Sequence, residues 1–332
     1  MQMRQAISLD QVRLVPSYSE ILSRDNVTTA VYLGKQEQIE LKIPVMASPM
    51  ETICEAPMAN ELAKLGALGI IHRFMDVDKQ ARQVQEVVQK FGTYAVGAAV
   101  GVKITDRERL QALIDAGCGF IVFDIAHGHS FMQKEAVQYA RKNFSKNMVY
   151  MGGSITTVKA VEDQAFWGID IMRIGIGVGS HCTTTITTGV GEPMFSALQE
   201  CTVYRIDRLS YVADGGLRTV GDIAKSIGAG AHAIMSGYLF AGTEETPEIY
   251  QRIGEFPHDK LVKAYRGSAS QEAKRARGES ERHIEGVMTL VEHKGTASRI
   301  IRNIHEGLTS AMSYCGSNTI AQFHKKAKFV RI

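Results

Sequence analysis

Runs of apolar, often β-branched residues recur along the chain, and segments with helical periodicity separate them. Eight of these runs predict strands, over residues 43–50, 68–73, 94–101, 119–126, 147–153, 170–177, 209–216 and 231–239. The amphipathic segments predict helices over residues 56–64, 77–90, 106–116, 131–143, 158–167, 194–202 and 219–227, and a final helix over 297–312. Apolar strands that alternate with helices are typical of a parallel sheet covered on its outside. Eight such units favour a closed (β/α)8 TIM barrel of the α/β class, and an open doubly wound sheet is the alternative.

Several predicted strands end in glycine or a polar residue, among them Ser48, Asp124 and Asp214. In a (β/α)8 barrel the carboxyl ends of all strands meet on one face, where the active site lies. The eighth strand is followed by a charged, turn-rich segment, residues 243–296, which is called the insertion below. We interpret the insertion as a flap at the catalytic face of a single domain that spans residues 1–332. A solvated charged segment with no role in the site is the alternative.

The composition is that of an ordinary globular protein. Hydrophobic residues make up 45% of the 332 residues and charged residues 22%, so neither disorder nor a fibrous repeat is expected. The 38 basic and 35 acidic residues give a net charge of +3, which argues against a nucleic-acid partner. No apolar run approaches the roughly 18 residues that span a bilayer, and the first residues lack the apolar core of a signal peptide. We therefore expect a soluble, cytoplasmic protein without a membrane partner.

One cysteine of the five stands in a reactive context. The cysteines never form a Cys-x-x-Cys pair and the ten histidines lack metal-ligand spacing, which argues against a disulfide framework or a structural zinc site. Cys182 lies in a loop of glycine and hydroxyl residues, 175–191, just after the sixth predicted strand. Backbone N–H groups in such a loop favour a thiolate, and the strand end gives the sulfur access to substrate. We predict that Cys182 is a nucleophile and that the other four cysteines are inert core residues.

The loops after the seventh and eighth strands carry Asp214-Gly-Gly and Ser236-Gly-Tyr. In barrels of this class these two loops commonly hold a phosphate group. Gly216 and Gly237 can bring backbone N–H groups close to phosphate oxygens, and Ser236, like Ser180, can donate a hydroxyl hydrogen. No Gly-x-Gly-x-x-Gly fingerprint opens a helix after a strand, so a dinucleotide would bind on the barrel face rather than in a Rossmann module. The sequence therefore predicts a nucleotide or sugar phosphate as ligand.

Short stretches spread over nearly the whole chain carry a further signal. They are Ala47-Ser-Pro-Met-Glu-Thr, Gly69-Ile-Ile-His-Arg, Asp124-Ile-Ala-His-Gly-His-Ser, Gly-Ser-x-Cys-x-Thr at 179–184, Ala213-Asp-Gly-Gly, Met235-Ser-Gly-Tyr-Leu, Tyr265-Arg-Gly-Ser, Ile284-Glu-Gly-Val and Gly307-Leu-Thr-Ser-Ala-Met-Ser-Tyr. Together they resemble the family of IMP dehydrogenase and GMP reductase. This resemblance implies a (β/α)8 barrel, usually a homotetramer. In that family the cysteine attacks C2 of a purine nucleotide, and a nicotinamide cofactor exchanges hydride with the same carbon.

The resemblance also implies roles for residues that match these stretches. The implied catalytic residues are Cys182, Thr184 and Glu285. Thr184 and Glu285 would relay a proton, and Glu285 would also form a hydrogen bond with the N1 edge of the purine. The implied substrate-binding residues are Ser48, Met50, Ser180, Asp214, Gly215, Gly216, Ser236, Gly237, Tyr265, Gly267 and Ser268. The implied cofactor-binding residues are Asp124, Ala126, His127 and Arg282, of which Arg282 would hold the extra phosphate of NADPH. The carbonyl groups of Gly175, Gly177 and Cys182 would hold a monovalent cation, K⁺.

Three features favour a reductase. Lys90 leads directly into the third strand without regulatory CBS-type repeats, the insertion lacks the Arg-Tyr pair with which dehydrogenases activate water, and residues 188–191 and 327–332 are similar to reductases. We predict NADPH-dependent reductive deamination of GMP to IMP and ammonia through a thioimidate on Cys182. An IMP dehydrogenase that makes XMP with NAD is the alternative, because the first 90 residues look more like a dehydrogenase. A non-catalytic paralogue that binds purine nucleotides is a remoter one. Ser154, Thr185 and Met194 depart from the usual family residues, which would alter details of substrate contact.

Overall fold

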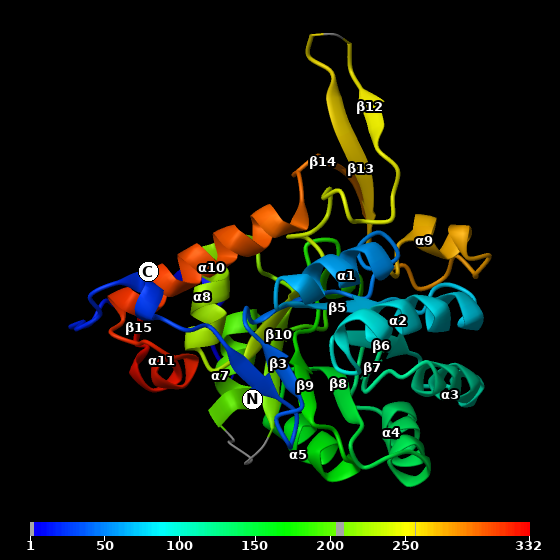
Figure 1. Cartoon of the computed structure of the whole chain (residues 1–332), viewed down its shortest axis with the longest axis horizontal. Coiled ribbons are helices and arrows are strands. Elements are labelled where there is room, and N and C mark those ends of the chain that lie inside the picture. Colours follow the sequence, from blue (N-terminus) through cyan, green and yellow to red (C-terminus); the bar gives the residue numbers. More distant parts are fainter. Residues whose placement is uncertain (1–2, 204–208, 256) are drawn as a thin grey trace.

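The structure is a computed structural model that describes residues 3–203, 209–255 and 257–332 (Figure 1). Residues 1–2 and residue 256, which belongs to the insertion, lie outside the described residues. In the described chain, eight parallel strands close into a barrel in sequence order, with the last strand paired to the first. They are β4 (Val45–Ala47), β5 (Leu68–Ile71), β6 (Val96–Val100), β7 (Phe120–Phe123), β8 (Val149–Ile155), β9 (Ile171–Ile174), β10 (Ser210–Asp214) and β11 (Ala233–Ser236). The predicted (β/α)8 barrel is confirmed.

The barrel strands are apolar because they are enclosed on both faces. All residues of the strands β4, β5, β6, β7, β8, β9 and β11 are buried. In β10 only the last residue, Asp214, is partly exposed. Seven of the eight strands are shorter than predicted; β4, for example, covers three residues instead of 43–50, whereas β8 has the predicted length and is shifted by two residues. The difference arises because residues at the carboxyl ends, such as Ser48, leave the sheet to form the loops of the site.

Helices cover the outside of the barrel (Figure 1). They are α1 (Ala56–Lys64), α2 (Val77–Phe91), α3 (Arg107–Asp115), α4 (Phe131–Asn143), α5 (Val158–Trp167), α7 (Met194–Val203), α8 (Val220–Gly228) and α10 (Ala297–Tyr314). Side-chain caps fix several starts: the Ser130 hydroxyl accepts from the Gln133 N–H at α4, and the Thr219 hydroxyl accepts from the Asp222 N–H at α8. None of the described helices is long and apolar enough to cross a membrane.

Shorter elements escape the sequence pattern. These elements are the 3₁₀ turns η1 (Leu9–Gln11), η2 (Arg24–Asn26) and η3 (Ile104–Asp106), the strands β1 (Val12–Leu14), β2 (Val31–Leu33), β3 (Ile39–Leu41) and β15 (Phe329–Arg331), and the helices α6 (Thr184–Thr188) and α11 (Ile320–Lys326). Pairing of β1 with β15 joins the two ends of the chain. Helix α6 consists of β-branched residues, whose helix propensity is low, so local composition gives no sign of it.

The insertion forms a small sheet of its own. Strands β12 (Gln251–Ile253), β13 (Lys260–Arg266) and β14 (Met288–Glu292) pair antiparallel in that order, and α9 (Gln271–Ala276) follows β13. The β12–β13 hairpin projects away from the barrel (Figure 1). The other end of β13 reaches the catalytic face, where the Arg266 N–H donates to the Thr52 hydroxyl at 3.3 Å. The insertion therefore meets the barrel where the strand ends converge.

Candidate active site

A cavity of about 700 Å³ lies at the carboxyl ends of the barrel strands, between the strand-end loops and the insertion. Its size is within the range of about 300–1,000 Å³ that is usual for small-molecule sites. Most of the predicted site residues line it: Ser48, Met50, Asp124, Ala126, Ser180, Cys182, Thr184, Asp214, Gly215, Gly216, Ser236, Gly237, Tyr265, Gly267, Ser268 and Glu285. Residues from seven separate parts of the sequence are thus brought to one place.

The loop that carries Cys182 is shaped by its own glycines and by the insertion. Gly175, just after β9, has φ +136°, and a Cβ there would lie 2.3 Å from the Asp214 carbonyl oxygen, so only glycine fits. The loop then turns, with the Cys182 N–H donating to the Gly179 carbonyl at 3.1 Å. Residues 285–287 of the insertion run alongside: the Thr183 N–H donates to the Glu285 carbonyl at 2.9 Å. The loop is therefore held from both sides.

A chain of hydrogen bonds joins the three predicted catalytic residues. The Cys182 thiol donates to the Thr184 hydroxyl oxygen at 3.1 Å, and the Thr184 hydroxyl donates to Glu285 Oε2 at 2.7 Å. Each side chain is partly exposed to the cavity. A thiol linked through a hydroxyl to a carboxylate can lose its proton as the sulfur attacks, which is how a neutral nucleophile is activated.

The other four cysteines have a different environment. Cys54, Cys118, Cys201 and Cys315 are all buried, as predicted for core residues. Burial raises the pKa of the Cys118 and Cys201 thiols to about 12, so these sulfurs stay protonated and unreactive. Only Cys182 combines access to the cavity with a proton acceptor among the described cysteines.

The predicted phosphate loops lie beside the Cys182 loop. Gly215 has φ +87°, and a Cβ there would lie 3.0 Å from the Gly179 nitrogen, so the Asp214 loop and the Cys182 loop pack closely. The Ser236 hydroxyl accepts from the Leu239 N–H at 3.3 Å, which leaves its hydrogen free to donate. Burial raises the pKa of Tyr265 to about 12, so its phenol also remains a donor at neutral pH. Hydroxyl and backbone donors around one end of the cavity suit an anionic group.

Charged residues form one wall of the cavity. Arg173, a basic residue within the apolar strand β9, is 5% exposed and lies between two carboxylates, 3.6 Å from Asp124 Oδ1 and 3.8 Å from Asp214 Oδ2. Burial raises the pKa of Asp214 to about 6, and Arg173 opposes that shift. The Arg73 guanidinium donates to Asp124 Oδ2 at 3.0 Å. Sequence reasoning missed both arginines, although a charge inside an apolar strand is a usable signal for Arg173.

Comparisons with known proteins find relatives of one family. The family model for the IMP dehydrogenase / GMP reductase domain matches residues 6–332. An inosine-5'-monophosphate dehydrogenase from Cryptosporidium parvum is 32% identical, over 98% of this chain and 92% of that protein. A GMP reductase from Leishmania major is 28% identical, over 99% and 94%. A crystal structure of a cysteine-to-alanine variant of GMP reductase from Trypanosoma brucei, in complex with guanosine 5'-monophosphate, superposes with a TM-score of 0.90 at 26% identity and covers 99% of this chain and 96% of that one.

The chain belongs to the IMP dehydrogenase and GMP reductase family. Members of this family are oxidoreductases that act on purine nucleotides and use nicotinamide dinucleotides, and relatives of similar identity carry both names.

The family's expected cofactor residues divide in the structure. Asp124 and Ala126 line the cavity, whereas His127 and Arg282 are exposed and are not among the lining residues. Further residues that sequence reasoning did not single out line the same cavity: Lys103, Thr105, Asp106, Met132, Lys274, Arg277 and Glu279. The Arg282 carbonyl accepts from the Lys274 ammonium, so the Arg282 segment lies against α9.

The carbonyls expected to hold a cation belong to the Cys182 loop. No hydrogen bond within the described residues ends on the carbonyl oxygens of Gly175, Gly177 or Cys182. Their lone pairs are therefore available to a monovalent cation. The described residues contain no cluster of three or more histidine, cysteine or acidic side chains that could hold a metal ion.

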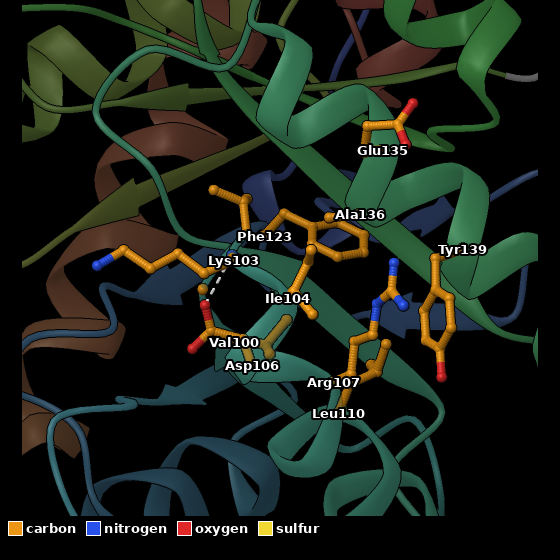
Figure 2. A pocket seen from close by; sticks show the side chains of 12 residues that line it. Val100, Lys103, Ile104, Asp106, Arg107, Leu110, Phe123, Glu135, Ala136 and Tyr139 are labelled. Atoms are coloured by element: carbon orange, nitrogen blue, oxygen red, sulfur yellow. Dashed lines mark hydrogen bonds between the residues drawn. The ribbon is translucent and has the colours of Figure 1, made fainter.

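A second, smaller cavity of about 30 Å³ lies behind the loop after β6 (Figure 2). Arg107 stacks on the Tyr139 ring there, with its Cζ 3.9 Å from the ring centroid, and the Asp106 carboxylate accepts from the Lys103 N–H at 2.8 Å. The space is enough for water but not for a nucleotide. Lys103 and Asp106 line both this cavity and the larger one.

Proposed function

We propose that the protein is a GMP reductase, which converts GMP, NADPH and two protons into IMP, ammonium and NADP⁺. The observation that carries the proposal is the hydrogen-bond chain from the Cys182 thiol through Thr184 to Glu285, inside a cavity of nucleotide size. This chain supplies what a covalent displacement at C2 needs, namely an activated sulfur and a route for protons. The lack of an Arg-Tyr pair in the insertion favours the reductase over a water-activating dehydrogenase.

In the first half of the reaction, Cys182 forms a bond to C2 and ammonia leaves. The thiol proton passes through the Thr184 hydroxyl to Glu285 as the sulfur attacks. Glu285 returns this proton by the same path to the departing amine, and solvent supplies the second proton that makes ammonium. The C2–N bond breaks, and the purine remains on Cys182 as a thioimidate. The same Glu285 carboxylate, when ionised, accepts from the N1–H of the purine.

In the second half, C2 is reduced and released from the protein. The cofactor supplies a hydride when bound. Cys182 then leaves C2 as a thiolate and takes up a proton, and the product carries hydrogen at C2. The loops with Ser180, Gly216 and Ser236 hold the 5'-phosphate throughout, and Asp214 accepts from the ribose hydroxyls, so that C2 stays over the sulfur.

The residues present fit a dinucleotide beside the purine. The cavity that contains Cys182 is also lined by Asp124, Ala126 and Lys103, which offer a hydrogen-bond acceptor, an exposed backbone segment and a cation. We assign the extra phosphate of NADPH to Arg282, whose exposed guanidinium can bond it in a bidentate manner. K⁺ would be held by the free carbonyls of the Cys182 loop and would fix that loop.

An IMP dehydrogenase is the second candidate. It is favoured by the 32% identity to the Cryptosporidium parvum dehydrogenase over nearly the whole chain. The same thioimidate would form from IMP with loss of hydride to NAD⁺, and water would then release XMP.

A two-substrate assay separates the candidates. Purified protein is mixed with GMP and NADPH, and separately with IMP and NAD⁺, while the absorbance of reduced nicotinamide is followed. We expect NADPH oxidation with GMP, with one ammonium released per NADPH, and no NADH formation with IMP. Formation of NADH with IMP would overturn the proposal, and no change in either mixture would favour a binding-only paralogue. The Cys182→Ala protein is the blank for both mixtures.

We further propose that the enzyme is a homotetramer in the cytoplasm. Large exposed apolar side chains near the N-terminus support association between copies: Leu22 is 97% exposed and Tyr18 is 86% exposed. Light scattering during size-exclusion chromatography measures the mass, and a monomer of 36.5 kDa would contradict the tetramer.

A further inference from the structure

The residue before the nucleophile, His181, has contacts that the mechanism above does not use. Its side chain lines the cavity but is only 8% exposed, and its ring centroid lies 4.0 Å from that of Tyr265. The Nε2 atom is 2.6 Å from the hydroxyl oxygen of Thr289, in β14 of the insertion. The Nδ1 atom is 3.2 Å from the hydroxyl oxygen of Ser180, which we assign to the phosphate. His181 therefore stands between the insertion and the phosphate loops.

The two hydroxyl groups allow only two arrangements of hydrogen. A neutral imidazole has one donor and one acceptor nitrogen, and each ring nitrogen of His181 faces one hydroxyl group. If Nε2 carries the hydrogen, Nδ1 must accept the Ser180 hydroxyl hydrogen. If Nδ1 carries it, Nδ1 donates to the Ser180 oxygen and Thr289 donates to Nε2. Only the second arrangement leaves the Ser180 hydrogen free for a ligand.

A phosphate in the cavity selects the second arrangement. A hydrogen bond to an anion is about twice as strong as one between neutral groups, so the Ser180 hydroxyl gains by turning its hydrogen from Nδ1 to phosphate. The Thr289 hydroxyl can follow, because no other hydrogen-bond partner for it occurs among the described residues. The hydrogen on one nitrogen of His181 is then fixed by the bond made to the other, as is usual for functional histidines.

We propose that His181 is a positioning residue that directs the Ser180 hydroxyl hydrogen toward the 5'-phosphate of the nucleotide and ties this orientation to Thr289 of the insertion. The inference rests on the proposed function, because it takes the ligand at Ser180 to be the phosphate of a purine nucleotide. It adds a specificity element: His181 contributes to binding of the monophosphate and not to binding of the nucleoside.

The same contact links phosphate binding to the catalytic carboxylate. The Val287 N–H donates to the His181 carbonyl at 3.1 Å, and Glu285, two residues earlier, bonds Thr184. Thr289, two residues later, bonds the imidazole. One short segment of the insertion is therefore held to the Cys182 loop by backbone bonds in the middle and by a side chain on each side. A bound phosphate that strengthens the His181–Thr289 bond also holds Glu285 at Thr184.

The test measures binding, in the Cys182→Ala background, so that no covalent step interferes. GMP, IMP and guanosine are titrated by calorimetry into this protein and into the same protein with His181→Val, His181→Asn or Thr289→Val added. We expect His181→Val to weaken binding of the two nucleotides about tenfold, because the Ser180 hydroxyl loses the Nδ1–H donor that directs its hydrogen toward the phosphate, and to leave guanosine within about twofold. His181→Asn should keep nucleotide affinity within about threefold of the parent, because an asparagine amide can donate in place of Nδ1–H.

Two further variants separate positioning from general damage. Thr289→Val keeps the shape and the backbone bonds of β14, and we expect it to weaken nucleotide binding about threefold through loss of the donor to Nε2. Thr187→Val is the matched control: Thr187 also joins the Cys182 region to the insertion, by a 3.4 Å bond to the Ile284 carbonyl, but does not touch the phosphate loops. It should bind all three ligands like the parent.

The outcomes for the two proposals differ. Unchanged nucleotide affinity in His181→Val, or an equal loss for guanosine and GMP, would overturn the role of His181. Failure of the proposed reductase activity would instead appear as a lack of NADPH oxidation with GMP by the protein with Cys182 intact, whatever the binding results.

Discussion

The barrel and the insertion are built in different ways, and the site needs both. The barrel strands are buried on both faces, whereas β12 is exposed throughout and β14 is exposed at all positions but Val291. Yet Glu285 and Tyr265 come from the insertion and face Cys182 and Asp214 from the barrel. A rigid core therefore carries the nucleophile, and a segment with little core of its own completes the site.

Polar contacts hold the insertion together and attach it to the barrel. Inside the insertion, the ammonium of Lys263, 3% exposed in β13, donates to the carbonyls of Thr243 and Thr246 at 2.9 Å each. Near the cavity, the Arg277 guanidinium donates to Glu51 of the barrel at 2.9 Å and lies 4.2 Å from the Phe74 ring centroid. A segment held by few apolar contacts opens at lower free energy than the core. Changes on the barrel side and on the insertion side should therefore have distinct kinetic signatures.

The largest effect is expected from the barrel side of the hydrogen-bond chain. Cys182→Ala removes the nucleophile, and we expect kcat with GMP and NADPH to fall at least about 10⁴-fold, as for other covalent nucleophiles. Equilibrium binding of GMP should remain, because the phosphate and ribose contacts are untouched. Cys201→Ala, in the buried face of α7, is the control and should keep kcat. Normal turnover by Cys182→Ala would remove the covalent mechanism.

The insertion side should give the next largest effect. Glu285→Gln keeps the shape of the side chain but cannot take the proton that Thr184 passes on, so we expect kcat to fall about 10²–10³-fold. KM for GMP should change less, because the amide oxygen can still accept from N1–H. Glu281→Gln is the matched control, since Glu281 is a surface carboxylate of the insertion paired with Arg275. Equal kcat values for both variants would show that Glu285 carries no proton.

The same contrast explains what could be predicted from the sequence. The barrel strands and their helices can be predicted from hydrophobic periodicity because burial on both faces dictates residue type. The carboxyl ends of the strands meet on one face of such a barrel, which predicts that Cys182, Asp214 and Ser236 lie on that face. The match of Glu285 to a family motif suggested its role, but its bond to Thr184 depends on contacts across about 100 residues of chain. Arg73 and Arg277 were missed because a surface arginine and a cavity arginine look alike in a sequence.

Substitutions in the barrel should lower the free energy of unfolding more than substitutions in the insertion. Ile121 is fully buried in β7, and Ile121→Ala should lower the stability of the barrel by about 2–5 kcal/mol through loss of apolar contact and the cavity left behind. Ile253 in β12 is 39% exposed, and Ile253→Ala should cost less than about 1 kcal/mol. Urea unfolding followed by the fluorescence of Trp167, the one tryptophan of the chain, measures both. Similar losses would mean that the insertion has a core as tightly packed as the barrel's.

The smallest expected effect is the pH dependence of GMP binding, which distinguishes the role of Asp214 from that of Glu285. Burial raises the pKa of Asp214 to about 6, so this carboxylate, which we propose accepts from the ribose hydroxyls, is ionised above pH 6 and protonated below it. If only the ionised form binds, the Kd for GMP should rise about tenfold between pH 7.5 and pH 5. The phosphate of GMP titrates with a second pKa of about 6 and weakens binding in the same direction.

Asp214→Asn separates these two contributions to nucleotide binding. The variant binds GMP more weakly at neutral pH but lacks the carboxylate, so any pH dependence that remains belongs to the phosphate. The difference in slope between parent and variant then belongs to Asp214. Because we propose that Asp214 acts in binding and Glu285 in proton transfer, we expect Asp214→Asn to change KM far more than kcat, the reverse of Glu285→Gln. A parent and a variant with the same pH dependence of Kd would mean that Asp214 is ionised throughout this range and that Arg173, rather than burial, dominates its pKa.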